Sequence, residues 1–144
     1  MVGNILKTIF LSLGIACFVQ FILTSIDSDS VNSFLLSNLT NLQVALLAIN
    51  AATLGIVLTK IRELIEQTGN KAVFESTKNE MLVSIKEQLA LIIFSLIVIA
   101  FSAAKTPIFH LSPDIYKTLL LSSFIYSLFI LYDTAKSVFV ILDY

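Results

Sequence analysis

The chain has very few of the residues that build disulfides, metal sites and catalytic centres. Its 144 residues include one cysteine, one histidine, four glycines, two prolines and no tryptophan. The single Cys17 excludes an intramolecular disulfide, and one cysteine with one histidine cannot form a Cys/His metal site. The glycines form no phosphate-binding loop, and no group of serine, histidine and acidic residues exceeds what chance gives. We therefore expect no enzymatic activity, no cofactor and no bound metal.

Charge is scarce as well. Nine basic and ten acidic residues give a net charge of −1, which excludes the basic field that a nucleic-acid-binding protein needs. Charged residues make up 13% of the chain, whereas about a quarter is usual in a soluble protein. Hydrophobic residues make up 57%, and the mean hydropathy is +0.93. Such a chain has too few polar residues to cover an apolar core in water, so we expect the lipid bilayer to surround it.

Four apolar segments predict four transmembrane helices. A helix that crosses the hydrocarbon core needs about 20 residues, and the segments fit if their ends are read generously. The expected fold is all-α, with one polytopic domain over residues 1–144 and the second and third helices extended into a hairpin. The expected spans are residues 5–24, 41–60, 88–104 and 118–138, and the hairpin covers about residues 60–87.

The distribution of basic residues predicts the orientation. Seven of the nine lie near the termini and in the 60–87 connection, and two lie in the 105–117 connection. The 25–40 connection carries Asp27 and Asp29 and no basic residue. Because lysine and arginine near helix ends favour the cytoplasmic side, we expect both termini and the hairpin in the cytoplasm.

The 60–87 connection is predicted to be helical on both sides of a turn. Gly69 is suited to the left-handed cap that ends a helix, and Thr77-x-x-Glu80 fits a capping box that opens the next one. Residues 71–77 between them are expected to form one more helical turn or a structured loop. A charged helical hairpin is most often simply solvated, but it is also a plausible docking site for a cytosolic protein. The candidate partner-binding residues are Arg62, Glu66, Lys71, Glu75 and Lys78.

Polar residues inside the expected spans are the other functional candidates: Gln20, Asn50, Asp133 and Lys136. Charges and amides are costly in hydrocarbon and usually face protein or water. Asp133 and Lys136 are expected to interrupt the fourth span. Two interpretations of Asp133 stay open: a bundle-facing acid that lines a pore or gates a conformational change, or a helix end at the interface with Lys136 extending toward water.

Small residues surround Asn50 on the second span. Ala48-x-x-x-Ala52 and Ala51-x-x-x-Gly55 have the spacing that lets another helix backbone approach closely. One interpretation is packing among the four helices of one chain. The other is self-association, in which Asn50 side chains meet across a symmetry axis or line a central channel.

The short four-span plan with a charged hairpin, including Asn41–Leu64 (NLQVALLAINAATLGIVLTKIREL), resembles the small membrane proteins of bacterial anti-phage defence. It is most similar in plan to the membrane subunits of Kiwa-type systems, and next to phage exclusion proteins of the RexB type. The resemblance implies a multi-pass sensor or scaffold of the bacterial inner membrane that forms a homo-oligomer and engages a cytosolic partner. The RexB-like alternative implies a small ion channel or membrane-depolarising effector.

Overall fold

The computed structural model describes residues 2–69, 72–104 and 112–142, and its four elements are all α-helices. They are α1 (Val2–Ser25), α2 (Ser30–Thr68), α3 (Ala72–Ser102) and α4 (Pro113–Leu142). Each contains a stretch that is long and apolar enough to cross a membrane. The prediction of an all-α chain with four such helices is confirmed, and the helices indicate a multi-pass membrane protein.

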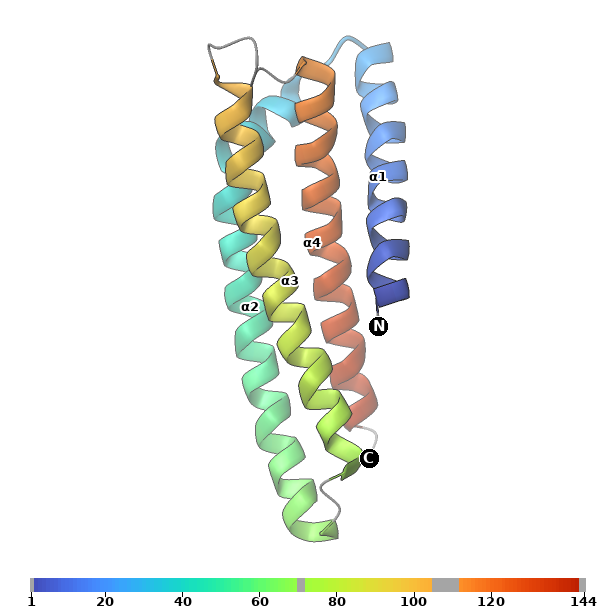
Figure 1. Cartoon of the computed structure of the whole chain (residues 1–144), viewed down its shortest axis with the longest axis vertical. Coiled ribbons are helices and arrows are strands. Elements are labelled where there is room, and N and C mark those ends of the chain that lie inside the picture. Colours follow the sequence, from blue (N-terminus) through green and yellow to red (C-terminus); the bar gives the residue numbers. More distant parts are fainter. Residues whose placement is uncertain (1, 70–71, 105–111, 143–144) are drawn as a thin grey trace.

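The central helix of the arrangement is α4 (Figure 1). It contacts α1, α2 and α3, and α2 also contacts α3. The N-terminus, the C-terminal end of α4 and the turn between α2 and α3 lie toward one end of the bundle, and the α1–α2 connection and the start of α4 lie at the other. α4 is therefore the one helix that side chains from each of the other three can contact.

The helices differ greatly in length. α1 has 24 residues, or about 36 Å, which matches a hydrocarbon core of about 30 Å with little to spare. α2 has 39 residues, or about 58 Å. As a result α2, α3 and the C-terminal part of α4 continue well past the N-terminal end of α1 (Figure 1). We call this part the projection, and it comprises residues 54–69, 72–85 and 134–142.

The bundle has two apolar clusters. The first draws on all four helices and consists of Ala16, Leu35, Leu39, Val98, Leu120 and Leu121. The second lies in the projection and consists of Leu54, Val57, Ile61 and Met81, with Leu64, Ile65, Ile85 and Val138 packed against it. Because the second cluster joins α2, α3 and α4, the projection has a packed core of its own.

The predicted connection at residues 25–40 is shorter than expected, because α2 already begins at Ser30. Leu35, Leu39 and Gln43 are all buried, and their spacing of four places them on one face of a helix. Polar side chains on the other face form hydrogen bonds with the backbone of the helix itself. Ser37 Oγ, for example, donates to the Ser33 carbonyl at 3.0 Å. The serine-rich composition resembles a loop, but burial of the apolar face makes it helical.

The turn between α2 and α3 follows the prediction at one side and departs from it at the other. Gly69 ends α2 with φ 70°, and its N–H donates to the Ile65 carbonyl at 2.9 Å. α3 begins at Ala72, so the prediction that Thr77-x-x-Glu80 opens this helix is wrong. Both residues lie inside the helix. No glycine or proline occurs between residues 72 and 77, and Glu75 in the first turn suits the positive end of the helix dipole.

The fourth span is expected to be interrupted at Asp133–Lys136. Its apolar stretch ends at Lys136, while α4 itself runs unbroken from Pro113 to Leu142. Neither aspartate nor lysine breaks a helix interior, and packing beyond this point sustains the helix. Val138, one turn further along, packs against the apolar cluster of the projection. The C-terminal end of α4 thereby joins the projection.

Candidate functional site

The interior of the bundle contains an unusual number of polar side chains, which we call the polar core. All four helices contribute to it, and each member is at least about nine-tenths buried. In a membrane protein, buried polar residues are expensive and mark functional or packing sites. The polar core consists of Ser12, Gln20, Asn32, Gln43, Asn50, Gln88, Ser95, Ser123, Ser127 and Thr134.

Ser123 of α4 is the junction of the polar core. Its Oγ accepts a 2.8 Å hydrogen bond from Gln43 Nε2 of α2 and lies 2.8 Å from Ser95 Oγ of α3. Ser127, one turn further along α4, accepts a second bond from Gln43 at 3.3 Å. Three helices are thus joined through one small hydroxyl in an apolar interior.

A second polar group lies nearer the projection. Asn50 Nδ2 donates to Gln88 Oε1 at 2.9 Å, so Asn50 has a partner within its own chain. Close by in sequence, Tyr126 donates its hydroxyl to Glu87 Oε2 at 3.3 Å. Together these contacts tie α2 to α3 and α3 to α4.

The hydrogen-bonding capacity of the polar core is not used up. Several fully buried atoms have no hydrogen-bond partner among the described residues, and such atoms are rare and costly in folded proteins. They are Gln20 Oε1, Asn32 Oδ1, Gln43 Oε1, Asn50 Oδ1, Gln88 Nε2 and Thr134 Oγ1. Each of the four helices supplies at least one of these atoms.

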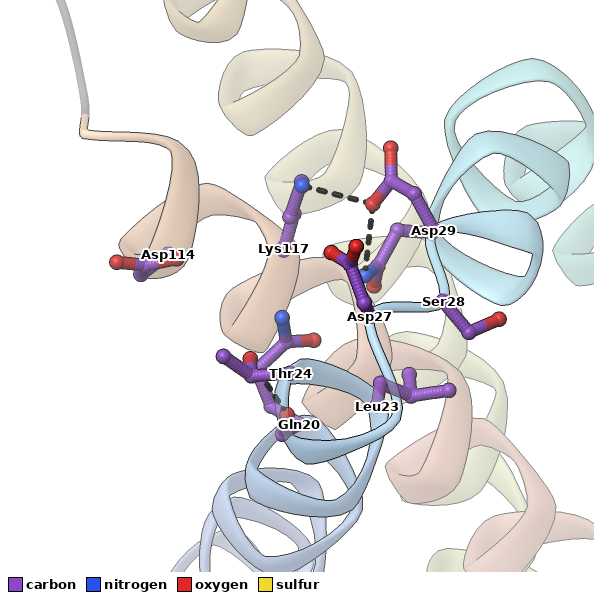
Figure 2. Close-up of a pocket in the computed structure, with 9 residues that line it drawn as sticks. Gln20, Leu23, Thr24, Asp27, Ser28, Asp29, Asp114 and Lys117 are labelled. Atoms are coloured by element: carbon purple, nitrogen blue, oxygen red, sulfur yellow. Dashed lines mark hydrogen bonds and ion pairs between the residues drawn. The ribbon is translucent and has the colours of Figure 1, made fainter.

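A pocket of about 180 Å³ opens where α1, α2 and α4 meet at the end away from the projection. Figure 2 shows its lining, with Asp27 and Asp29 from the α1–α2 connection facing Lys117 of α4. Lys117 Nζ lies 2.7 Å from Asp29 Oδ1, and Asn32 Nδ2 donates to the same oxygen at 3.2 Å. These two hydrogen bonds, the one from Lys117 first, lower the pKa of the Asp29 carboxyl below its ordinary value.

The predicted intramembrane residues fall into two groups. Gln20 and Asn50 are buried in the polar core. Asp133 and Lys136 are exposed on α4, so neither belongs to that core. The packing of the helices therefore brings Asn50 together with Gln88 but leaves Asp133 on the exposed side of α4.

The small residues near Asn50 lie on the outside of the bundle. Ala48, Ala51, Ala52 and Gly55 are all exposed, on the face of α2 that does not contact the polar core. A methyl group added at Gly55 would meet nothing within 4 Å. Among the described residues, no close approach requires a glycine at position 55.

Most of the predicted hairpin residues are exposed in the projection. Arg62 and Glu66 form an ion pair of 3.1 Å on the outer face of α2. Glu75 and Lys78 are exposed on the first turns of α3. Lys71 lies outside the described residues.

Several members of the polar core were not singled out from the sequence, notably Gln43, Gln88 and Ser123. A signal was present for two of them. Gln43 and Asn50 are seven residues apart, which places both on one face of a helix, and Ser123 and Ser127 are four apart. Gln88 adjoins an apolar run next to charged residues, and its sequence position gives no sign that it turns inward.

The arrangement of these polar side chains supports hydrogen bonding between the helices. Two acidic residues lie beside the polar core: Asp29, which accepts a hydrogen bond from Asn32, and Glu87, half-buried against Tyr126. Across residues 2–69, 72–104 and 112–142, no three histidine, cysteine or acidic side chains are grouped so as to hold a metal ion. No protein-family model, curated protein or solved structure matches this chain.

Proposed function

We propose that the protein is a non-enzymatic sensor or scaffold subunit of a bacterial anti-phage defence system in the cytoplasmic membrane. In this proposal it forms a homo-oligomer through its membrane spans and engages a cytosolic protein through the projection. The resemblance described above suggested the function class. The observation that carries the proposal is the projection itself, which combines a packed apolar core with exposed charges of both signs.

A docking surface for a soluble partner has to hold its shape outside the membrane. Ile61 of α2 and Met81 of α3 are each 5% exposed, and Val138 of α4 packs beside them. The core fixes the outward direction of Arg62 and Glu66 on α2 and of Glu75 and Lys78 on α3. A rigid surface that bears both signs of charge suits a partner of complementary charge pattern.

The docking test uses a photo-crosslinking residue in place of Asn79, an exposed position beside Lys78, in the full chain in its host cells. We expect a cross-linked adduct of one defined mass, and we expect Glu75→Lys with Lys78→Glu to abolish it while the net charge stays the same. Lys7→Glu on α1, outside the projection, is the matched control and should leave the adduct intact. An adduct that persists after the swap, or the absence of any protein adduct, contradicts docking through the projection.

The orientation has its own test. In a Cys17→Ser background, single cysteines at Ser28 and Glu75 lie at opposite ends of the bundle. A membrane-impermeant thiol reagent applied to spheroplasts should label the cysteine at position 28 and reach that at position 75 only after lysis. The reverse pattern contradicts cytoplasmic termini.

Self-association through the exposed small residues of α2 is tested by native mass measurement in mild detergent. Gly55→Leu adds bulk where the chain itself leaves open space, so the protomer should stay folded while the oligomer dissociates. Ala90→Leu, at an exposed position of α3, is the control. An unchanged oligomer in Gly55→Leu contradicts this interface.

A second candidate function is an ion or proton pathway, and the polar core favours it. Amide oxygens without partners inside an apolar bundle attract water, and a file of water would connect the pocket to the projection. Proteoliposomes that carry the wild-type chain should pass protons or potassium under an applied potential, and Gln43→Met should reduce this flux. Flux equal to that of empty liposomes contradicts the pathway.

A further inference from the structure

We propose that the pocket between α1, α2 and α4 binds a small organic cation that carries ammonium N–H donors. The proposal is independent of the sensor and pathway functions above. It rests on the charge of the pocket rim and on two buried amides at its base.

The rim of the pocket is acidic. Asp27, Asp29 and Asp114 line the pocket together with Lys117, so three carboxylates stand against one ammonium and two negative charges remain in excess. Lys117 is already paired with Asp29. Within the described residues, Asp27 and Asp114 form no salt bridge of their own. An anionic ligand is therefore disfavoured and a cationic one favoured.

The base of the pocket supplies the second, independent observation. Gln20 is 9% exposed and Asn32 is 6% exposed, and both line the pocket. Gln20 Oε1 and Asn32 Oδ1 are buried acceptors without a hydrogen-bond partner among the described residues. Figure 2 shows the Gln20 amide directed up from α1 toward Lys117 and Asp27, into the pocket.

Acceptors at the base and carboxylates at the rim match the donors of an alkylammonium ion. Each N–H of such an ion can reach an amide oxygen or a carboxylate, and a hydrogen bond between an ion and an amide is stronger than one between neutral groups. Leu23 also lines the pocket and offers an apolar surface to a short carbon chain. The volume of about 180 Å³ far exceeds what one water needs.

A bare metal ion fits this pocket less well. Calcium and magnesium gather six or more oxygen ligands around one point. Among the residues that the structure describes, no three acidic, histidine or cysteine side chains come together in that way. The acceptors of the pocket are instead spread from base to rim, as an elongated amine requires.

The test titrates the full chain in nanodiscs by calorimetry with 1,4-diaminobutane as the probe. The comparison ligands are tetramethylammonium, which is cationic without N–H donors, neutral 1,4-butanediol, and calcium. We expect 1,4-diaminobutane to bind at least about tenfold more tightly than each of them, because a lost hydrogen bond to a charged donor weakens binding by about that factor.

Variants locate the site. Gln20→Met and Asn32→Leu keep the side-chain volume and remove the acceptors, and each should weaken diamine binding by about tenfold. Asp114→Asn should weaken it less, because that carboxylate is exposed. Asn41→Leu, at an exposed position of α2 away from the pocket, is the matched control.

Three results overturn the proposal: no binding of the diamine, equal binding of tetramethylammonium, or tighter binding of calcium. The proposal is also overturned if neither Gln20→Met nor Asn32→Leu weakens diamine binding. If an amide variant fails to fold, the ligand comparison on the wild-type chain still decides, because it separates directed N–H donation from general attraction of positive charge.

Discussion

Asn50 of α2 and Gln88 of α3 form a side-chain hydrogen bond of 2.9 Å, and neither residue has any exposed surface. The pair lies between the apolar residues that surround it on both helices, so no water outside the bundle can replace either partner. Loss of one partner therefore leaves the other amide buried and unpaired, which costs more than the bond itself contributes.

Asn50→Leu should destabilise the bundle by about 1–2 kcal/mol, because Gln88 then loses its buried partner. Adding Gln88→Met to Asn50→Leu should recover part of this loss, since no orphaned amide remains. Unfolding of the purified chain by a denaturing detergent measures both effects. A double variant that is as unstable as the sum of the single ones would show that the two amides are not coupled.

Ser123→Ala should be the most destabilising serine substitution in α4. It removes an acceptor for Gln43 and a partner for Ser95, both at 2.8 Å, and we expect a cost of about 1–3 kcal/mol. Ser122→Ala is the neighbouring control, because Ser122 makes a single longer contact of 3.4 Å with Ser12. Equal stability of the two variants would argue against Ser123 as the junction.

Gly69→Ala should destabilise the chain by about 1 kcal/mol, because alanine is strained at the left-handed φ of 70° that closes α2. Gly55→Ala makes the same change within a straight helix where nothing lies within 4 Å, so it should be neutral or stabilising. Thermal unfolding of both variants in the same detergent measures the two changes in stability, which should have opposite signs. A matched loss in both variants would contradict the role of Gly69 as a cap.

The ion pair between Asp29 and Lys117 should stabilise the folded chain at neutral pH and stop doing so in acid. The folded-state pKa of Asp29 lies below its ordinary value of 3.8, so the unfolded chain binds a proton more readily than the folded one. The stability that the ionised Asp29 contributes is present above pH 3.8 and is lost as the pH falls through the lowered folded-state pKa of this residue. Unfolding measured from about pH 6 down to about pH 2 should show a steeper loss in the wild type than in Asp29→Asn. Parallel curves would contradict the ion pair.

The sequence by itself determined the class of the protein and the end of one helix. A chain with 57% hydrophobic residues and so little charge requires an apolar solvent, and its four long apolar segments predict four spanning helices. Gly69 also marks the end of α2 without any tertiary information, since its conformation is a local property. These features depend on composition and on single residues.

The sequence was less reliable where two local signals competed. Serines and asparagines at residues 30–40 resemble a connection, and Thr77 with Glu80 resembles a helix start, yet both segments are helical. Burial of Leu35 and Leu39 decides the first case. In the second case, α3 begins at Ala72, five residues before Thr77, and has Glu75 in its first turn.

Only the tertiary structure decided which polar residues meet. A helix surrounded by lipid is apolar nearly all round, so its periodicity does not reveal its inner face. Whether Asn50 pairs with Gln88, and Gln43 with Ser123, depends on the rotation and height of each helix relative to α4. Those positions follow from the packing of all four helices together, and no single segment of the sequence contains them.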